Sequence, residues 1–250
     1  MSVQRKYVAS IAGFDPTAGA GILADLKCFE QHQVYGFGIC TALTVQTDNN
    51  FISVEWQSAN QIISQLAPLL EKFETTAIKI GLIKELSILE EVVAFIKLNN
   101  SDIALILDPI LSSSSGFGFH NWNTTELTRI LTQLTLITPN YEEMKSMGNR
   151  KSVEKAASGW AAYCPVLLKG GHHPLLPGRD LLFETPDKVH VLDPIPENIF
   201  PKHGSGCILS AAITANIAHG YSLNEACHRA KNYITNFLNS NTSLLGYHHH

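Results

Sequence analysis

Residues 200–212, with the sequence FPKHGSGCILSAA, place a glycine-rich turn directly before a long apolar run. Gly204 and Gly206 let successive backbone N–H groups converge, because neither residue carries a Cβ atom. The helix that we expect to start here adds unpaired N–H groups and a partial positive charge. This combination predicts a pocket for phosphate, or for negative charge that develops during a reaction.

Cys207 lies at the positive end of this expected helix. Such a position should lower the pKa of its thiol, so that a thiolate could take a proton from a reacting hydroxyl group. Gly204, Ser205, Gly206 and Cys207 would direct their N–H groups at the bound phosphate. The alternative is a tight turn in which a small buried cysteine only caps the helix.

Outward from this turn, short β-rich runs alternate with helical patterns along the whole chain. Several runs are continuously apolar, as expected of parallel strands that are covered on both faces. The predicted strands are Tyr7–Ala12, Gly36–Val45, Ala77–Gly81, Ile103–Leu107, Leu134–Thr138, Pro165–Lys169, Leu181–Glu184 and Val189–Leu192. The predicted helices are Ala20–His32, Asn60–Phe73, Leu86–Asn99, Thr124–Thr132, Ser152–Tyr163, Gly206–His219 and Leu223–Leu238. This alternation predicts one α/β domain over residues 1–247, an open and mostly parallel sheet with helices on both faces.

Polar and glycine-rich residues follow each predicted strand of the parallel part of this sheet. In chain order they are Asp15 and Gly19, Gln46 and Asp48, Gly81, Asp108 with Pro109, Asn140, and Gly170 with Gly171. Ligands of open α/β sheets bind at the carboxyl ends of the strands, so these residues predict one shared site. A random scatter of turn residues is the poorer explanation, since residues of this kind follow each of these strands.

The composition is that of an ordinary globular protein, with 250 residues, 45% hydrophobic residues and a formal net charge of −4. No basic run marks a nucleic-acid surface, and no stretch reaches about 18 consecutive apolar residues, so we expect no nucleic-acid or membrane partner. Five widely spaced cysteines without a Cys-x-x-Cys pair favour reduced thiols in a cytoplasmic protein. The terminal residues 248–250 are all histidine and resemble a purification-tag remnant, so they carry no metal argument.

Several separated motifs resemble the ribokinase-like superfamily, and within it the hydroxymethylpyrimidine/phosphomethylpyrimidine kinases of thiamine biosynthesis. The resemblance covers essentially the whole chain. In the family's order, its motifs are IAGFDPTAGAGI at 11–22 with ADLK at 24–27, TALTVQ at 41–46, KIGL at 79–82, Asp108-Pro109, Thr138–Asn140 with Glu143, LKGGH at 168–172 and HGSGC at 203–207. Most branches of the superfamily have Asp where this chain has Cys207. A cysteine there is typical of the pyrimidine kinases and of a smaller set of pyridoxal kinases.

The resemblance implies roles for the residues at these motifs. The catalytic residues would be Gly204, Ser205, Gly206 and Cys207. The substrate-binding residues would be Gly13, Asp25, Gln46 and Leu82, and the ATP-binding residues Asp108, Asn140, Lys169, Gly171 and Lys231. Glu143 would hold Mg²⁺ through water. The amide of Gln46 suits its role, because it can pair with a ring nitrogen and an exocyclic amine of an aminopyrimidine.

Some of these side chains also have simpler explanations. Asp25 could be a solvated carboxylate on a helix, and Lys231 could lie on a solvated helix face. Asp108 precedes Pro109 and could be a turn residue at a strand end. Lys169 ends an apolar strand, where it would either meet phosphate or pair with an acid.

The chain departs from the family's pattern at four places. Phe14 stands where a small polar residue is usual, and this change would reshape the substrate pocket. Tyr141-Glu142 replaces the usual Leu-Pro, Ser112–Phe119 lacks an acidic residue, and the segment between Glu143 and Val166 is short. These last three changes would affect the nucleotide side and the surface.

The resemblance therefore predicts a cytoplasmic Mg²⁺- and ATP-dependent kinase of 4-amino-5-hydroxymethyl-2-methylpyrimidine and of its monophosphate. Family members are often homodimers, so the resemblance makes a homodimer one possible assembly, although the sequence itself does not indicate the oligomeric state. Two alternatives stay open at this point: a pyridoxal kinase of the cysteine-bearing type, and a non-catalytic vitamin-binding protein on the same scaffold. The glycine-rich turn argues against the second, since a binding protein needs no site for a γ-phosphate.

Overall fold

The computed structural model describes residues 5–112, 116, 118–119, 122, 124–148, 152–171, 173, 175–195 and 199–249. The loop at residues 112–119 is therefore described only in part, and His172 and His250 lie outside the described residues.

In the described part of the chain, nine strands form one sheet in the order β3-β2-β1-β4-β5-β6-β7-β8-β9. They are β1 (Tyr7–Phe14), β2 (Tyr35–Gln46), β3 (Phe51–Trp56), β4 (Thr75–Ile80), β5 (Ala104–Leu107), β6 (Leu136–Ile137), β7 (Val166–Leu168), β8 (Asp180–Thr185) and β9 (Lys188–Leu192). The pairs between β2 and β7 are parallel, whereas β3, β8 and β9 pair antiparallel with their neighbours. The predicted mostly parallel sheet is confirmed, and the structure adds β3, which the sequence analysis did not predict.

The helices follow the predicted alternation with one addition. They are α1 (Gly21–Gln31), α2 (Ala59–Lys72), α3 (Leu86–Asn99), α4 (Thr124–Leu131), α5 (Tyr141–Met147), α6 (Val153–Trp160), α7 (Ser205–Ala218) and α8 (Leu223–Asn239). The short helix α5 was not predicted. None of these helices is long and apolar enough to cross a membrane.

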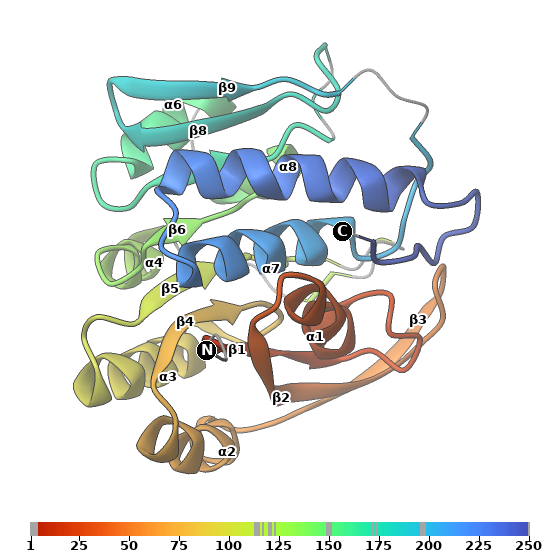
Figure 1. Cartoon of the computed structure of the whole chain (residues 1–250). Coiled ribbons are helices and arrows are strands. Elements are labelled where there is room, and N and C mark those ends of the chain that lie inside the picture. Colours follow the sequence, from red (N-terminus) through yellow and green to blue (C-terminus); the bar gives the residue numbers. More distant parts are fainter. Residues whose placement is uncertain are drawn as a thin grey trace.

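Helices cover both faces of the sheet, with α1, α7 and α8 lying together across one of them (Figure 1). On that face, buried residues such as Ile208 and Phe237 join one apolar cluster with side chains of the strands. The helices α2 to α6 supply a second cluster on the opposite face, which includes Ile62 and Leu89. The helix α7 is buried almost all round because it packs against the sheet, α1 and α8. Its first turn is therefore held firmly next to the strand ends.

Candidate active site

A cavity of about 630 Å³ opens where the parallel strands end. The predicted site residues that line it are Gly13, Gln46, Leu82, Asp108, Asn140, Glu143, Lys169, Gly171, Gly204, Ser205, Gly206, Cys207 and Lys231. Asp25 is the predicted site residue that does not line it. The sheet order puts the ends of β1 and β2 on one side of the cavity, and the end of β7 with the start of β8 on the other. The structure thus brings residues from distant parts of the sequence into one concave site.

The turn before α7 has glycines where its backbone requires them. Gly204 is the N-cap of α7, with φ 72° and ψ 13° in the left-handed region. A Cβ atom there would overlap the carbonyl oxygen of Gly19 and lie 2.8 Å from Cα of Ala20. A Cβ atom at Gly206 would lie 3.3 Å from Nζ of Lys169. The first turn of α7 and the Lys169 ammonium group therefore present N–H donors and a positive charge to the same part of the cavity.

Lys169 and Asp108 form an ion pair on the cavity wall, with 2.6 Å between Nζ and Oδ1. Ser210 on α7 donates to Oδ2 of Asp108 over 3.2 Å. Burial tends to raise the pKa of Asp108, but Lys169 and Lys79 outweigh it and hold that pKa below its usual range. Burial would lower the pKa of Lys169, but the neighbouring carboxylates raise it. Lys169 thus pairs with an acid and also faces the cavity, where its charge can meet a ligand.

Asn140 and Glu143 begin α5 as a capping box. The side-chain oxygen of Asn140 accepts from N of Glu143 over 2.8 Å, and Oε2 of Glu143 accepts from N of Asn140 over 2.7 Å. Burial raises the pKa of Glu143 from 4.5 to about 7, although Lys169 lowers it. Its carboxyl group therefore changes charge near neutral pH, close to the Lys169–Asp108 pair.

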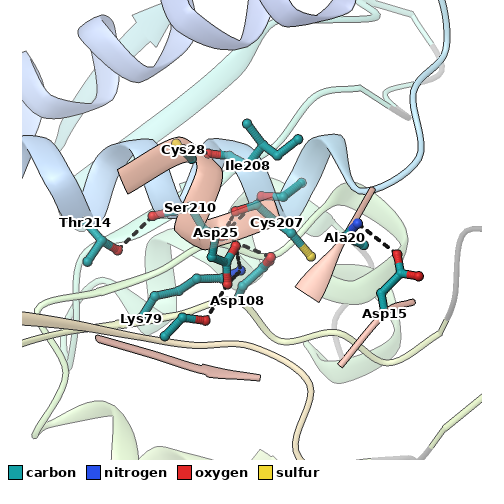
Figure 2. Close-up of polar contacts among 12 residues, drawn as sticks. Asp15, Ala20, Asp25, Cys28, Lys79, Asp108, Cys207, Ile208, Ser210 and Thr214 are labelled. Carbon is teal, nitrogen blue, oxygen red and sulfur yellow. Dashed lines mark hydrogen bonds and ion pairs between the residues drawn. The ribbon is translucent and has the colours of Figure 1, made fainter. Parts of the chain in front are cut away.

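Asp25 lies behind the cavity, which corrects its prediction as a substrate-binding residue. It is fully buried on α1, and its oxygens accept from Nζ of Lys79 on β4 at 2.6 and 2.7 Å and from Ser10 at 2.5 Å (Figure 2). The alternative of a solvated carboxylate is also wrong. Burial raises the pKa of Asp25, while the charge of Lys79 and the hydrogen bonds from Lys79 and Ser10 act in the opposite direction. Burial would lower the pKa of Lys79, but the carboxylates of Asp25 and Asp108 raise it, so Lys79 stays charged.

Cys207 is buried at the first turn of α7, and the pKa of its thiol is not lowered as a helix start alone predicts. Burial raises the pKa of Cys207 from 9.0 to about 11, although Lys79 and a backbone N–H of Gly21 lower it. The expected thiolate at neutral pH is therefore wrong for the ligand-free protein, because removal from water outweighs the helix terminus. Figure 2 shows Cys207 beside the group formed by Asp25, Lys79 and Asp108.

The side of the cavity near β1 and β2 is lined by glycine, leucine and an amide. A Cβ atom at Gly13 would lie 3.0 Å from Cδ2 of Leu82, so a larger residue would narrow this side. Gln46 lines the same side, and its Nε2 donates to Oγ1 of Thr44 over 2.9 Å, which orients the amide. Phe14 is 37% exposed and is not among the residues that line the cavity, and its effect on the substrate pocket stays a prediction.

The opposite side of the cavity carries Lys231. Its Nζ donates to Oδ2 of Asp180 over 2.6 Å and to the carbonyl oxygen of Gly178 over 2.5 Å. Asp180 in turn accepts from N of Gly170 over 2.7 Å. Lys231 is only 9% exposed, so the alternative of a solvated helix face is wrong. Apolar side chains line the cavity on this side, namely Ile199, Ile234 and Leu238.

Residues 15–250 match the family model described as phosphomethylpyrimidine kinase. The chain belongs to the phosphomethylpyrimidine kinase family. A hydroxymethylpyrimidine/phosphomethylpyrimidine kinase of Aquifex aeolicus (strain VF5) is 30% identical over 245 residues, covering 94% of this chain and 95% of the relative. A pyridoxal kinase structure from Staphylococcus aureus in complex with ADP has a TM-score of 0.83 and 26% identity, covering 95% of this chain and 89% of that one. A phosphomethylpyrimidine kinase structure from Clostridium difficile 630 has a TM-score of 0.77 and 29% identity, covering 92% and 98%.

These similarities confirm the predicted family and the ribokinase-like fold, and make the chain a phosphotransferase of the phosphomethylpyrimidine kinase family. The sequence analysis placed Asp15 at the shared site only as a strand-end residue, and it assigned no individual role to Lys79, His203, Asp180 or Ser210. Lys79 could have been found, because a lysine within an otherwise apolar strand needs a partner. Asp15 and His203 line the cavity and contact each other at 2.8 Å, although nothing in the sequence indicates that they meet. No sequence pattern indicates a role for Asp180 or Ser210, because their partners Lys231 and Asp108 lie far from them along the chain.

Proposed function

We propose that this chain transfers the γ-phosphoryl group of ATP to the hydroxymethyl group of 4-amino-5-hydroxymethyl-2-methylpyrimidine, and then phosphorylates the monophosphate. The observation that carries this proposal is one cavity in which Gln46 and Lys231 lie on opposite sides of the turn Gly204–Cys207. A relative described as a kinase of both pyrimidine compounds supports the substrate. A similar structure with ADP supports ATP as the phosphoryl donor.

The proposed transfer depends mainly on alignment and charge neutralisation, because phosphoryl transfer needs little covalent help from a protein. The N–H groups of Gly204–Cys207 would bind the γ-phosphate and follow its charge as the bond to the leaving oxygen lengthens. Lys169 would neutralise the same oxygens. Its ion pair with Asp108, 2.6 Å long, holds it in place before a ligand binds.

Gln46 would select the ring of the substrate. An aminopyrimidine presents a ring-nitrogen acceptor beside an exocyclic amine donor, and a side-chain amide can pair with both. The bond from Nε2 to Thr44 leaves the amide in a fixed orientation, so little freedom is lost when the ring binds. Gly13 and Leu82 would lie against the ring, where a larger residue at Gly13 would intrude.

The oxygen-bearing side chains near the turn fit a hydrated Mg²⁺ ion. Among the described residues, no group of three or more His, Cys, Asp or Glu could enclose a metal. Such a sparse set suits Mg²⁺, which keeps several waters and takes other ligands from substrate phosphates. When bound, the ion would neutralise the β- and γ-phosphate oxygens. Glu143 would hold it through water, with its carboxyl group oriented by N of Asn140 over 2.7 Å.

Cys207 would take the proton of the attacking hydroxymethyl group. Its pKa of about 11 means that only a small fraction is thiolate at neutral pH in the ligand-free protein. Lys79 favours that fraction, because its positive charge lowers the pKa of the thiol. The role therefore predicts a rate that rises with pH above neutrality.

A pyridoxal kinase is the second candidate, and one observation favours it. The pyridoxal kinase structure has the higher TM-score of the two similar structures, 0.83 against 0.77. Pyridoxal also carries a hydroxymethyl group on a nitrogen heterocycle. It lacks an exocyclic amine beside the ring nitrogen, so Gln46 could pair with it only in part.

The proposal is tested by ADP release from Mg-ATP with the pyrimidine, pyridoxal and a sugar alcohol as acceptors. We expect the pyrimidine to be preferred. Gln46→Leu should raise the barrier for the pyrimidine by ~1–3 kcal/mol, which lowers kcat/KM roughly 5- to 150-fold, because polar groups of the ring lose their partner. It should leave ATP affinity unchanged. Gln31→Leu, outside the cavity at the end of α1, is the matched control. Preference for pyridoxal, or ligand binding without ADP release, would contradict the proposal.

The cellular compartment and the oligomeric state of the enzyme are also proposals. We infer that it works in the cytoplasm, because all five cysteines are free thiols. The homodimer expected from the family stays a prediction, and sedimentation of the purified protein would test it.

A further inference from the structure

Asp15 and His203 form a buried contact that the proposed transfer does not yet use. Nε2 of His203 donates to Oδ2 of Asp15 over 2.8 Å, and the two side chains are 5% and 1% exposed. Both residues line the cavity. Asp15 follows β1, and His203 directly precedes the turn that begins α7. The contact therefore joins two loops that come from opposite ends of the chain.

Asp15 holds the loop after β1 with both of its carboxylate oxygens. Oδ1 accepts from N of Thr17 over 2.9 Å. Oδ2 accepts from N of Ala20 over 2.9 Å (Figure 2). Burial tends to raise the pKa of Asp15, but His203 and Thr17 lower it below its usual value, so the carboxylate is retained. Ala20 is the N-cap of α1. The same carboxylate that contacts His203 therefore sets where α1 begins.

The two loops also touch through their backbones. A Cβ atom at Gly204 would lie 2.8 Å from Cα of Ala20, and a Cβ atom at Gly19 would lie 2.7 Å from Cδ2 of His203. A backbone N–H of Gly21, one residue beyond Ala20, interacts with the thiol of Cys207. A shift of the loop after β1 would therefore move an N–H group away from Cys207 and open the contact with Gly204.

We propose that Asp15 and His203 act as a positioning pair, which fixes the loop after β1 against the turn Gly204–Cys207. The turn can then present its N–H groups to the reacting phosphate while Gly21 keeps its N–H group on Cys207. The inference rests on the proposed function, because the reaction at this turn is phosphoryl transfer. Neither side chain needs to touch a reacting atom in this role. Misplacement of reacting groups by about 1 Å can cost a factor of about 10² in rate, so the pair should influence kcat more than binding.

The chemistry of Asp15 makes its replacement informative. Asn has one acceptor oxygen where Asp has two, so Asp15→Asn turns an N–H₂ group towards N–H of Thr17, N–H of Ala20 or Nε2 of His203. His203→Leu removes the donor altogether. His203→Gln keeps a donor at about the same reach and should retain part of the activity. Glu30→Gln is the matched control, because it removes an exposed acid of α1 from its ion pair with Arg5.

The first measurement is steady-state and single-turnover kinetics with the pyrimidine and Mg-ATP, together with the melting temperature of each variant. His203→Leu and Asp15→Asn should each lower kcat by about 10²-fold with little change in KM. The loss of kcat in the double variant should be no greater than that in the more affected single variant, because the two residues act as a unit. His203→Gln should lie between His203→Leu and the parent, and Glu30→Gln should match the parent. Additive losses, or unchanged kcat in both single variants, would overturn the proposal.

The second measurement is hydrogen–deuterium exchange of the ligand-free protein, which does not depend on activity. His203→Leu should raise exchange in residues 15–21, and Asp15→Asn should raise it at 203–208, without faster exchange in α3 or α8. Exchange equal to that of Glu30→Gln, or raised throughout the molecule, would overturn the pairing. A parent without kinase activity would contradict the proposed function instead, and the exchange result would still decide whether the pair fixes the loops.

Discussion

Two lysine–aspartate pairs in this molecule have the same shortest contact but different surroundings. Lys79–Asp25 and Lys169–Asp108 both have 2.6 Å between nitrogen and oxygen. The side chains of the first pair are both 0% exposed, whereas Lys169 keeps 11% of its surface exposed to the cavity. The first pair is sealed between α1 and β4, and the second lies on the wall at the ends of β5 and β7. A short ion pair therefore does not by itself identify a ligand-binding charge, and access to the cavity does.

We infer from this difference that the two ion pairs have different functions. The sealed pair cannot meet a phosphate, but its positive charge acts on the Cys207 thiol through the protein interior. The wall pair holds a positive charge that a phosphate can reach. Glu143 adds a third titratable group at this wall, where its pKa is about 7. Breaking each of these features in turn should affect stability and activity in different proportions.

The sealed pair should give the largest effect. Lys79→Met leaves the Asp25 carboxylate buried without its partner, which should lower the free energy of unfolding by ~3–5 kcal/mol. Urea denaturation measures the loss. The double variant Asp25→Leu with Lys79→Met should recover much of it, because no isolated charge remains. A loss below about 1 kcal/mol in the single variant would contradict the sealed arrangement.

The wall pair should affect activity more than stability. Lys169→Met removes a positive charge aimed at the phosphate and should lower kcat/KM by ~10²–10³-fold. Its cost in unfolding free energy should be smaller than that of Lys79→Met, since Asp108 keeps the hydrogen bond from Ser210 and the nearby positive charge of Lys79. Paired denaturation and kinetic measurements on both variants test this contrast. Equal stability losses with unchanged activity in Lys169→Met would remove the distinction between the two regions.

The smallest effect should come from Glu143 and depend on pH. Its pKa is raised from 4.5 to about 7 in the folded protein, so its contribution to stability is complete below about pH 4.5 and is lost as the pH rises through 7. Glu143→Gln is neutral at every pH and keeps an acceptor for N of Asn140. The variant should exceed the parent in unfolding free energy by roughly 1–3 kcal/mol at about pH 8, with the gap closing towards pH 5.

The same variant separates stability from metal use. Glu143→Gln should need more Mg²⁺ for half-maximal rate, and high Mg²⁺ should partly restore its activity. Identical Mg²⁺ titrations for variant and parent would exclude Glu143 as a group that holds the ion through water.

Most of the fold could be predicted from the sequence, because its parallel strands are continuous apolar runs between helical patterns. Phe51–Trp56 was missed as β3 since it is an edge strand, exposed at several positions, without such a run. The helix α5 is only seven residues long and begins at a capping box, Asn140 and Glu143, that was considered only for its chemistry. Both misses are short elements whose local signals are weak.

The site could be predicted as a set of strand-end residues but not as a network of contacts. Asp25 and Lys79 are 54 residues apart, and no local pattern indicates that a helix carboxylate meets a strand ammonium group. The pKa of Cys207 was mispredicted for a physical reason. The helix start, visible in the sequence, favours the thiolate, whereas burial, visible only in the fold, disfavours it more strongly.

The most direct test of the account concerns the proton of the hydroxymethyl group. Single-turnover phosphorylation isolates the chemical step from product release. Cys207→Ala should lower this rate by ~10²–10⁴-fold, the usual range for loss of a general base, while binding of the pyrimidine changes much less.

The pH dependence of the same measurement makes the test specific. With a Cys207 pKa of about 11, kcat/KM of the parent should rise between about pH 8 and about pH 10, above the range in which Glu143 titrates. The alanine variant should show no such rise. A near-parental single-turnover rate in Cys207→Ala, with the same pH profile as the parent, would contradict the role of Cys207 and leave the transfer to the N–H groups of the turn and to Lys169.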